Sequence, residues 1–143
     1  MGGAQPLAGV MAGARILVVE ADEAQIDKRI TRGFLQAKAH NLDEALHCEG
    51  SVGLLGNASD IYSELLQRGI VPDIVTDQTA AHDLRYGYLP GGYTLEQWRA
   101  LRESQPEKVM HDAGSSIARE VTAMLEFQKG GAVVFDNGNN IRS

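Results

Sequence analysis

The sequence predicts an α/β fold in which a mostly parallel sheet is flanked by helices. Two observations carry this prediction: short apolar runs of strand length alternate with longer amphipathic segments, and glycine or asparagine stands at the junctions between them. The chain has 143 residues and 43% of them are hydrophobic, which is enough to fill one core. We therefore expect residues 1–143 to form a single domain.

The N-terminal half shows the alternation clearly. Ile26, Ile30 and Phe34 recur at four-residue spacing, which is typical of one helix face, and Asn41 is a favourable N-cap residue for the helix that follows it. In chain order, the expected elements are a helix within residues 2–11, a strand over 15–20, a helix over 21–34, a helix over 42–46, a strand over 51–55 and a helix over 61–68.

The C-terminal half contains a strand, a long polar loop, two helices and a last strand. We expect the first strand over 70–76, and within it a buried segment over 73–75. Thr94 and Gln97 have the spacing of a capping box at the start of a helix. A long amphipathic helix follows over 106–129, and the strand over 132–135 comes after a glycine pair. The apolar stripe of the long helix is expected to face the core and consists of Val109, Ala113, Ile117, Val121, Met124 and Leu125.

Composition narrows the class of protein and its compartment. Thirteen basic and nineteen acidic residues give a net charge of −6, and no basic stripe is present, so nucleic acid is an unfavourable partner. The first residues lack the basic region of a signal peptide and the apolar length of a membrane span. A single cysteine, Cys48, fits a reducing environment. We expect a cytoplasmic protein.

Three segments that follow predicted strands carry groups suited to a nucleotide. Glu20 ends the first strand after a glycine-rich start and a helix, where an acid can accept both hydroxyls of an adenosine ribose. The Gly56-Asn57-Ala58 junction can present backbone N–H groups to an anion, although Asn57 serves equally well as a simple helix cap. The third segment, over 78–82, offers amide, hydroxyl and imidazole groups. Together these features favour a Rossmann-like nucleotide domain.

The polar loop after the third strand is the most informative segment, because packing alone does not require so many polar groups there. In open α/β sheets, ligands bind beyond the carboxyl ends of the strands, where this loop is expected to lie. A metal site or hydrolase built from Asp77, His82 and Asp83 is an alternative. One histidine and two acids in a loop lack the ligand spacing of a convincing metal site, so this alternative is weaker.

Several short segments, spread over the whole chain, together form a recognisable set: MGGAQP at 1–6, GLLGNA at 53–58, PDIVTDQ at 72–78 with His82-Asp83, GYLP at 87–90, and FD at 135–136 with GNNIR at 138–142. In these segments and in their order, the chain resembles the NAD-binding domain of urocanase, urocanate hydratase. The resemblance implies a Rossmann-like fold that holds NAD+. In urocanases this cofactor acts as an electrophile while water is added to urocanate, which gives imidazolone propionate in histidine breakdown.

The resemblance also implies the cofactor-binding residues. Met1 and Gly2 would belong to the pyrophosphate turn, Glu20 to the adenosine ribose, and Asn57 and Ala58 to a second turn that contacts the nucleotide. The rest of the cofactor pocket would consist of Gln78, Thr79, Ala80, Ala81, His82, Tyr88 and Leu89.

Several positions depart from the family pattern. Gln25 stands in place of a cofactor-contacting arginine, Ala80 in place of serine and Asn137 in place of tyrosine. The family's core domain, which supplies the active-site cysteine and acid, is expected to be missing on both sides, so the isolated chain would not catalyse the reaction. An alternative is a non-binding structural domain that self-associates as a homo-oligomer through apolar surface left exposed by the absent core domain.

Overall fold

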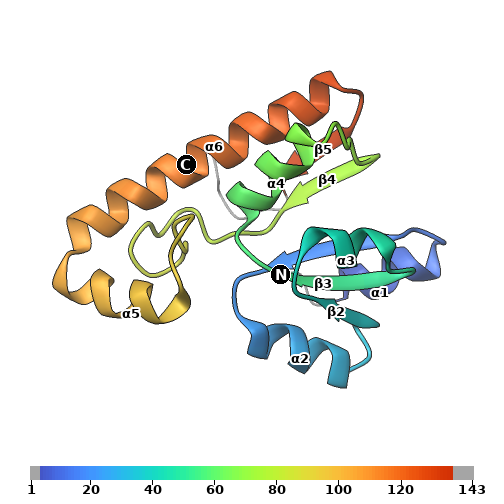
Figure 1. Cartoon of the computed structure of the whole chain (residues 1–143), viewed down its shortest axis with the longest axis horizontal. Coiled ribbons are helices and arrows are strands. Elements are labelled where there is room, and N and C mark those ends of the chain that lie inside the picture. Colours follow the sequence, from blue (N-terminus) through green and yellow to red (C-terminus); the bar gives the residue numbers. More distant parts are fainter. Residues whose placement is uncertain (1–3, 137–143) are drawn as a thin grey trace. The chain divides into compact units, whose positions relative to one another are not determined.

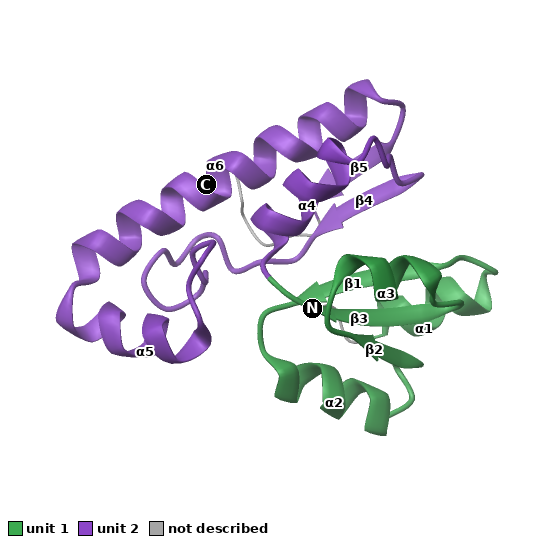
Figure 2. Ribbon diagram, in the orientation of Figure 1, with its two compact units in different colours: residues 1–56 green, residues 57–143 purple. Residues whose placement is uncertain are grey.

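The computed structural model describes residues 4–136 and confirms the predicted fold class. Helices and strands alternate, every described strand pair is parallel, and helices flank the sheets (Figure 1). Met1, Gly2 and Asn137, which the sequence analysis singled out, lie outside the described residues. The chain divides into two compact units, residues 1–56 and 57–143 (Figure 2).

The first unit contains a three-stranded parallel sheet in the order β1-β3-β2. Helices pack against these strands, and the side chains of Ile26 on α2 and Leu54 on β3 are fully buried. The elements of this unit are α1 (Gln5–Met11), β1 (Ile16–Glu20), α2 (Glu23–Thr31), β2 (Ala37–Ala39), α3 (Leu42–His47) and β3 (Ser51–Leu55).

Two boundaries in this unit differ from the sequence prediction. The helix expected over 21–34 begins at Glu23, because Asp22 caps it by accepting a hydrogen bond from the Ala24 N–H. It ends at Thr31, because Gly33 has a φ of 74°, which lies in the left-handed region and is incompatible with a right-handed helix. The strand β2 was not predicted, since a three-residue segment of two alanines and a lysine carries no strand pattern; it exists because it pairs with β3.

The second unit contains a two-stranded parallel sheet with three helices. Its elements are α4 (Ala58–Gln67), β4 (Ile74–Asp77), α5 (Leu95–Ser104), α6 (Pro106–Lys129) and β5 (Val133–Asp136). The register pairs Ile74 with Val133 and Asp77 with Asp136. The capping box of Thr94 and Gln97 is formed as predicted, and α6 has the predicted bounds. α4 packs against α6, and the rings of Tyr62 and Phe127 meet edge to face.

The strand expected over 70–76 begins only at Ile74 and includes Asp77. Its expected burial is wrong in part: Val75 is buried, whereas the Ile74 side chain is 62% exposed. The buried face of α6 also differs from the predicted stripe. Leu125 is 50% exposed, and the polar residues Ser116 and Glu120 take core positions. The apolar periodicity located α6 correctly. The assumption that only apolar residues face the core predicted some of its buried positions wrongly.

Within residues 4–136, no helix combines the length and the apolar character that a membrane crossing requires.

Candidate functional site

Glu20 lies at the carboxyl end of β1, as predicted, and is half-buried. Because β1 and β3 are parallel and in register, Glu20 is paired with Leu55 at the same edge of the sheet. The Gly56 N–H donates a hydrogen bond of 3.0 Å to the Glu20 carbonyl oxygen, and the Asp22 N–H donates one of 3.2 Å to its Oε1. The ends of β1 and β3 therefore meet, and the carboxylate at this edge is oriented by the turn into α2.

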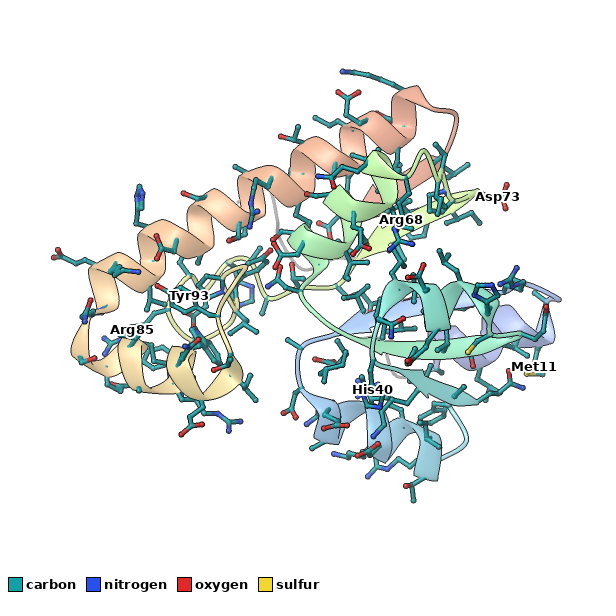
Figure 3. The ribbon with its side chains drawn as sticks, in the orientation of Figure 1. Met11, His40, Arg68, Asp73, Arg85 and Tyr93 are labelled. Carbon is teal, nitrogen blue, oxygen red and sulfur yellow. The ribbon has the colours of Figure 1, made fainter. Side chains whose placement is uncertain are left out.

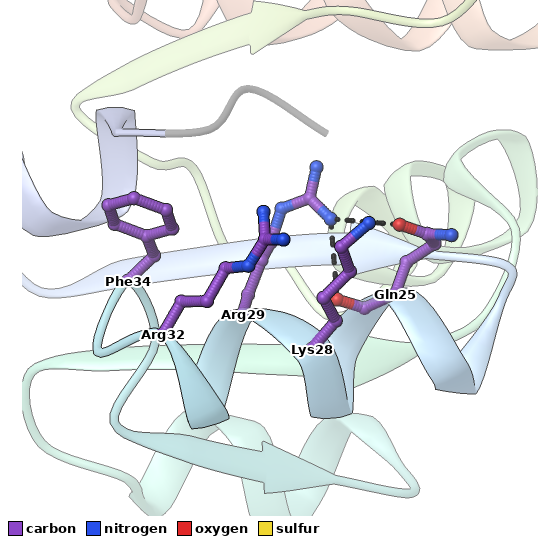
Figure 4. Close-up of a pocket in the computed structure, with 5 residues that line it drawn as sticks. All are labelled: Gln25, Lys28, Arg29, Arg32 and Phe34. Atoms are coloured by element: carbon purple, nitrogen blue, oxygen red, sulfur yellow. Dashed lines mark hydrogen bonds between the residues drawn. The ribbon is translucent and has the colours of Figure 1, made fainter.

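A basic pocket lies beside α2 in the same unit (Figure 4). It has a volume of about 110 Å³, and its lining residues are Gln25, Lys28, Arg29, Arg32 and Phe34. The four polar residues follow the i, i+3, i+4, i+7 spacing of one helix face. Figure 4 shows the three cationic side chains extending to the same side of α2, while the Arg29 Nη1 donates to the carbonyl and side-chain oxygens of Gln25 at 3.3 and 3.5 Å.

The positive charge of this pocket is not cancelled by the acids of α2. Glu23 and Asp27 both pair with Lys38 on β2, at 2.9 and 2.7 Å, and these contacts raise the pKa of the Lys38 ammonium. In the described part of the chain no ion pair involves Lys28 or Arg32. The sequence analysis singled out Gln25 but did not predict this pocket. The spacing of Lys28, Arg29 and Arg32 on one helix face could have indicated it.

Asn57 makes two contacts that connect the start of α4 to the polar loop. Its Oδ1 accepts hydrogen bonds from the Ser59 N–H at 3.0 Å and the Ser59 hydroxyl at 2.7 Å, so it caps the helix. Its Nδ2 donates to the Leu89 carbonyl oxygen at 2.6 Å. The capping interpretation is thereby confirmed, and Ala58 is the first residue of the helix. The same side chain brings two of the predicted site residues, Asn57 and Leu89, together.

The loop after β4 is held at its start by Asp77. This carboxylate is buried and accepts hydrogen bonds from the Thr79 N–H, at 3.0 and 3.1 Å to its two oxygens, and from the Thr79 hydroxyl at 2.9 Å. The neighbouring residues Gln78 and Ala80 are half-buried. The backbone N–H and the side chain of Thr79 are therefore both held by Asp77 in a local turn.

The far end of the loop is anchored in the core by Tyr88. This side chain is only 3% exposed, and its hydroxyl donates to the Oε2 of Glu120 on α6 at 2.7 Å. Ala81 packs with Tyr88 and Ala113 in one apolar cluster. Two predicted pocket residues, Ala81 and Tyr88, thus hold the loop onto α6 through their side chains. Sequence reasoning missed Glu120, although it stands four residues after Ser116 on the face that also carries Ala113.

A second polar contact set fixes the glycine-rich part of the loop. The Gly91 N–H donates to the Ser116 hydroxyl at 2.9 Å, and the Gly92 N–H donates to Asp60 at 3.3 Å. Farther along, the Tyr93 hydroxyl, labelled in Figure 3, donates to Asp112 at 2.6 Å. The loop is consequently attached to both α4 and α6.

The carboxylates of the alternative metal site are already engaged. Asp77 holds Thr79, and Asp83 accepts hydrogen bonds from the backbone N–H groups of Arg85 and Tyr86 at 3.1 and 2.9 Å. His82 is exposed. Within residues 4–136, no group of three or more histidine, cysteine or acidic residues is arranged to hold a metal ion.

The fold agrees with one comparison to known proteins. A family model, the urocanase Rossmann-like domain, matches the chain over residues 1–143, which is its whole length. The chain therefore belongs to the urocanase Rossmann-like domain family.

Proposed function

We propose that this chain binds NAD+ and serves as the cofactor module of a urocanate hydratase. The observation that carries the proposal is the Glu20 carboxylate at the carboxyl end of β1, beside the β3 turn. A carboxylate at this position of a Rossmann-like sheet is suited to accept the hydroxyls of an adenosine ribose. The match to the urocanase Rossmann-like family supports the choice of cofactor.

In the complete enzyme the reaction would be the hydration of urocanate to imidazolone propionate in cytoplasmic histidine breakdown. The bound NAD+ would supply the electrophile. This chain would hold and orient the cofactor, and the urocanase core domain would supply the active-site cysteine and acid. The isolated chain would bind NAD+ without catalysing the reaction.

The remaining contacts are the ones that the resemblance to urocanases implies. Met1 and Gly2 are proposed for the pyrophosphate turn, and Asn57 and Ala58 for the second turn. The basic pocket beside α2 adds positive charge in the unit that carries Glu20, which suits an anionic diphosphate. The loop contacts are proposed for Gln78, Thr79, Ala80, Ala81, His82, Tyr88 and Leu89. Because the Tyr88 and Ala81 side chains are buried, these two positions would act through the backbone or by shaping the loop.

The direct test is calorimetric titration of the folded chain with NAD+. Glu20→Ala should weaken binding about tenfold to a hundredfold, because charge-assisted hydrogen bonds to the ribose contribute roughly 1.5–3 kcal/mol. Glu49→Ala is a matched control: it removes the same charge from the same unit, at an exposed side chain. Equal weakening by both variants, or no heat up to roughly 1 mM NAD+, would contradict the proposal.

One observation favours a second candidate, self-association. Ile74, Val133 and Phe135 form an exposed apolar face of the β4–β5 sheet, and their side chains are 62%, 61% and 43% exposed. Light scattering over a range of protein concentrations would then show a dimer that Val133→Thr weakens. Met11→Thr, at an exposed residue of the other unit, should leave the dimer unchanged. A concentration-independent monomer would exclude this candidate.

A further inference from the structure

Glu120 is a fully buried acid in the middle of α6, with 0% of its surface exposed. Its Oε2 accepts the hydrogen bond of the Tyr88 hydroxyl at 2.7 Å. Its second oxygen, Oε1, accepts no hydrogen bond from any residue within 4–136. An ionised carboxylate in this position would leave one charged oxygen without a donor, which is costly in a protein core.

The chemistry of the neighbouring groups resolves this problem. Asp77, itself buried at the end of β4, interacts with the Glu120 carboxyl group through a side-chain hydrogen bond. Two carboxyl groups can share a hydrogen bond only if one of them carries a proton. Asp77 already accepts hydrogen bonds from the Thr79 N–H and hydroxyl. A proton on Glu120 would let its Oε1, which no other described residue engages, donate to Asp77.

We propose that Glu120 is a positioning residue that shares one proton with Asp77 and, through Tyr88, holds residues 77–88 in the conformation that binds the cofactor. The bridge joins the two ends of this segment, because Asp77 fixes Thr79 at one end and Glu120 fixes Tyr88 at the other. The assignment of a cofactor to this segment rests on the proposed function. The shared proton itself rests on the burial of both carboxyl groups, on the Tyr88 hydrogen bond to Oε2 and on an Oε1 that no other described residue engages.

Among residues 4–136, no cationic side chain takes the place of the proton beside Glu120. The titratable groups that face Glu120 are Asp77 from β4, Tyr88 from the loop and Tyr62 from α4. Burial, followed by the charge of Glu120, raises the pKa of both tyrosines, so both remain neutral. The adjacent Arg119 is directed to Ser59 and Asp60 instead.

Burial and the charge of Asp77 raise the pKa of Glu120 to about 8. Loss of the proton above this pH places two buried negative charges together and releases the loop.

The test begins without cofactor. Backbone amide NMR signals of residues 79–88 are followed in the full chain between about pH 6 and 9.5. In the wild type they should change with a midpoint near pH 8, which is the pKa of Glu120. Glu120→Gln should abolish this transition, because the amide can donate to Asp77 and accept from Tyr88 at every pH. Glu126→Gln is the matched control: the residue lies on the same helix, is exposed, pairs with Lys129, and should leave the transition intact.

A second variant keeps the proposal testable if Glu120→Gln does not fold. Tyr88→Phe removes the donor to Oε2, and this hydrogen bond lowers the pKa of Glu120. The midpoint of the loop transition should therefore rise above that of the wild type. A wild-type loop that does not respond to pH would overturn the proposal, as would a Glu120→Gln chain that titrates like the wild type.

Calorimetry with NAD+ at about pH 7 and 9 then tests the link to the cofactor. Affinity should fall about tenfold or more in the wild type and stay constant in Glu120→Gln. A pH-dependent loop in a chain that binds NAD+ with the same affinity at both pH values would overturn the positioning role. A pH-dependent loop in a chain that binds no NAD+ at either pH would support the shared proton while the proposed function fails.

Discussion

The Asn57 side chain makes one contact within its own helix terminus and one with a distant loop. It caps α4 through its oxygen and holds the loop carbonyl of Leu89 through its nitrogen. We predict that Asn57→Ala lowers the free energy of unfolding by about 2 kcal/mol, of which roughly 1 kcal/mol comes from each contact. Urea unfolding followed by circular dichroism measures this loss.

The matched control for that prediction is Asn41, which caps α3 by accepting from the Glu44 N–H at 2.9 Å and whose Nδ2 donates to the side chain of the same Glu44 at 2.7 Å. Asn41→Ala should cost only about 1 kcal/mol. Asn57→Asp should retain the cap and lose the donor to Leu89, so it should cost about 1 kcal/mol, half the loss of Asn57→Ala. An equal loss for Asn57→Ala and Asn41→Ala would show that the link to Leu89 contributes nothing.

Glu120 makes stability depend on pH. Its folded-state pKa, about 8, lies above the ordinary value of 4.5, so between these values the folded chain binds a proton that the unfolded chain has released. Its stabilising contribution is complete below about pH 4.5 and is lost as pH rises towards 8. We expect a fall of at most about 1.4 kcal/mol per pH unit across this window.

Urea unfolding at several pH values measures the slope. The difference between wild type and Glu120→Gln isolates the contribution of this group, because all other titrating residues are shared. The wild type should lose stability relative to the variant as pH rises from 5 to 8, the interval between the two pKa values of Glu120. A difference that does not change with pH would mean that the buried acid is ionised throughout.

At the scale of elements, the packing of α2 on β3 depends on Gly53. A β-carbon at this position would lie 2.7 Å from the Ile26 Cγ2 and 3.0 Å from the Leu35 Cδ1. We predict that Gly53→Ala destabilises the protein by about 1–3 kcal/mol, because the core must shift to admit one methyl group. Urea unfolding checks the magnitude.

Gly114 provides a control of opposite sign. It lies within α6, and a β-carbon there would meet no atom within 4 Å. Gly114→Ala should stabilise the chain by about 0.5–1 kcal/mol, since alanine loses less backbone entropy in a helix than glycine. Stabilisation by both substitutions would show that α2 and β3 are not closely packed.

At the scale of the whole molecule, the chain is acidic, with a net charge of −6, yet α2 presents a basic pocket. If this charge assists NAD+ binding, Lys28→Gln should weaken affinity roughly threefold to tenfold at low salt, which corresponds to about 1 kcal/mol. The effect should shrink as added salt screens the interaction. Calorimetric titrations at two ionic strengths measure both.

Lys38→Gln is the control for the net charge. Lys38 lies in the same unit, and Glu23 and Asp27 already neutralise it, so its replacement changes the total charge by the same amount away from the pocket. It should leave NAD+ affinity nearly unchanged. If both variants weaken binding equally, the pocket has no specific role.

Much of this molecule could be predicted from local sequence signals. Asn41, Thr94 with Gln97, and the long amphipathic period fixed the starts of three helices, because capping and periodicity act within a few residues. The position of Glu20 at a strand end was predicted for the same reason. The strand β2 was missed, since its residues form a strand only through their pairing with β3.

The sequence by itself determined the alternation of parallel strands and helices, the polar loop after β4 and the family to which the chain belongs. Only the tertiary structure decided that Tyr88 and Ala81 face the core, that Asn57 holds Leu89, and that Glu120 lies buried against Asp77. Asn57 and Leu89 are 32 positions apart, and Asp77 and Glu120 are 43 positions apart. Local patterns cannot encode such pairs, because burial and proton sharing depend on which distant segments the folded chain brings together.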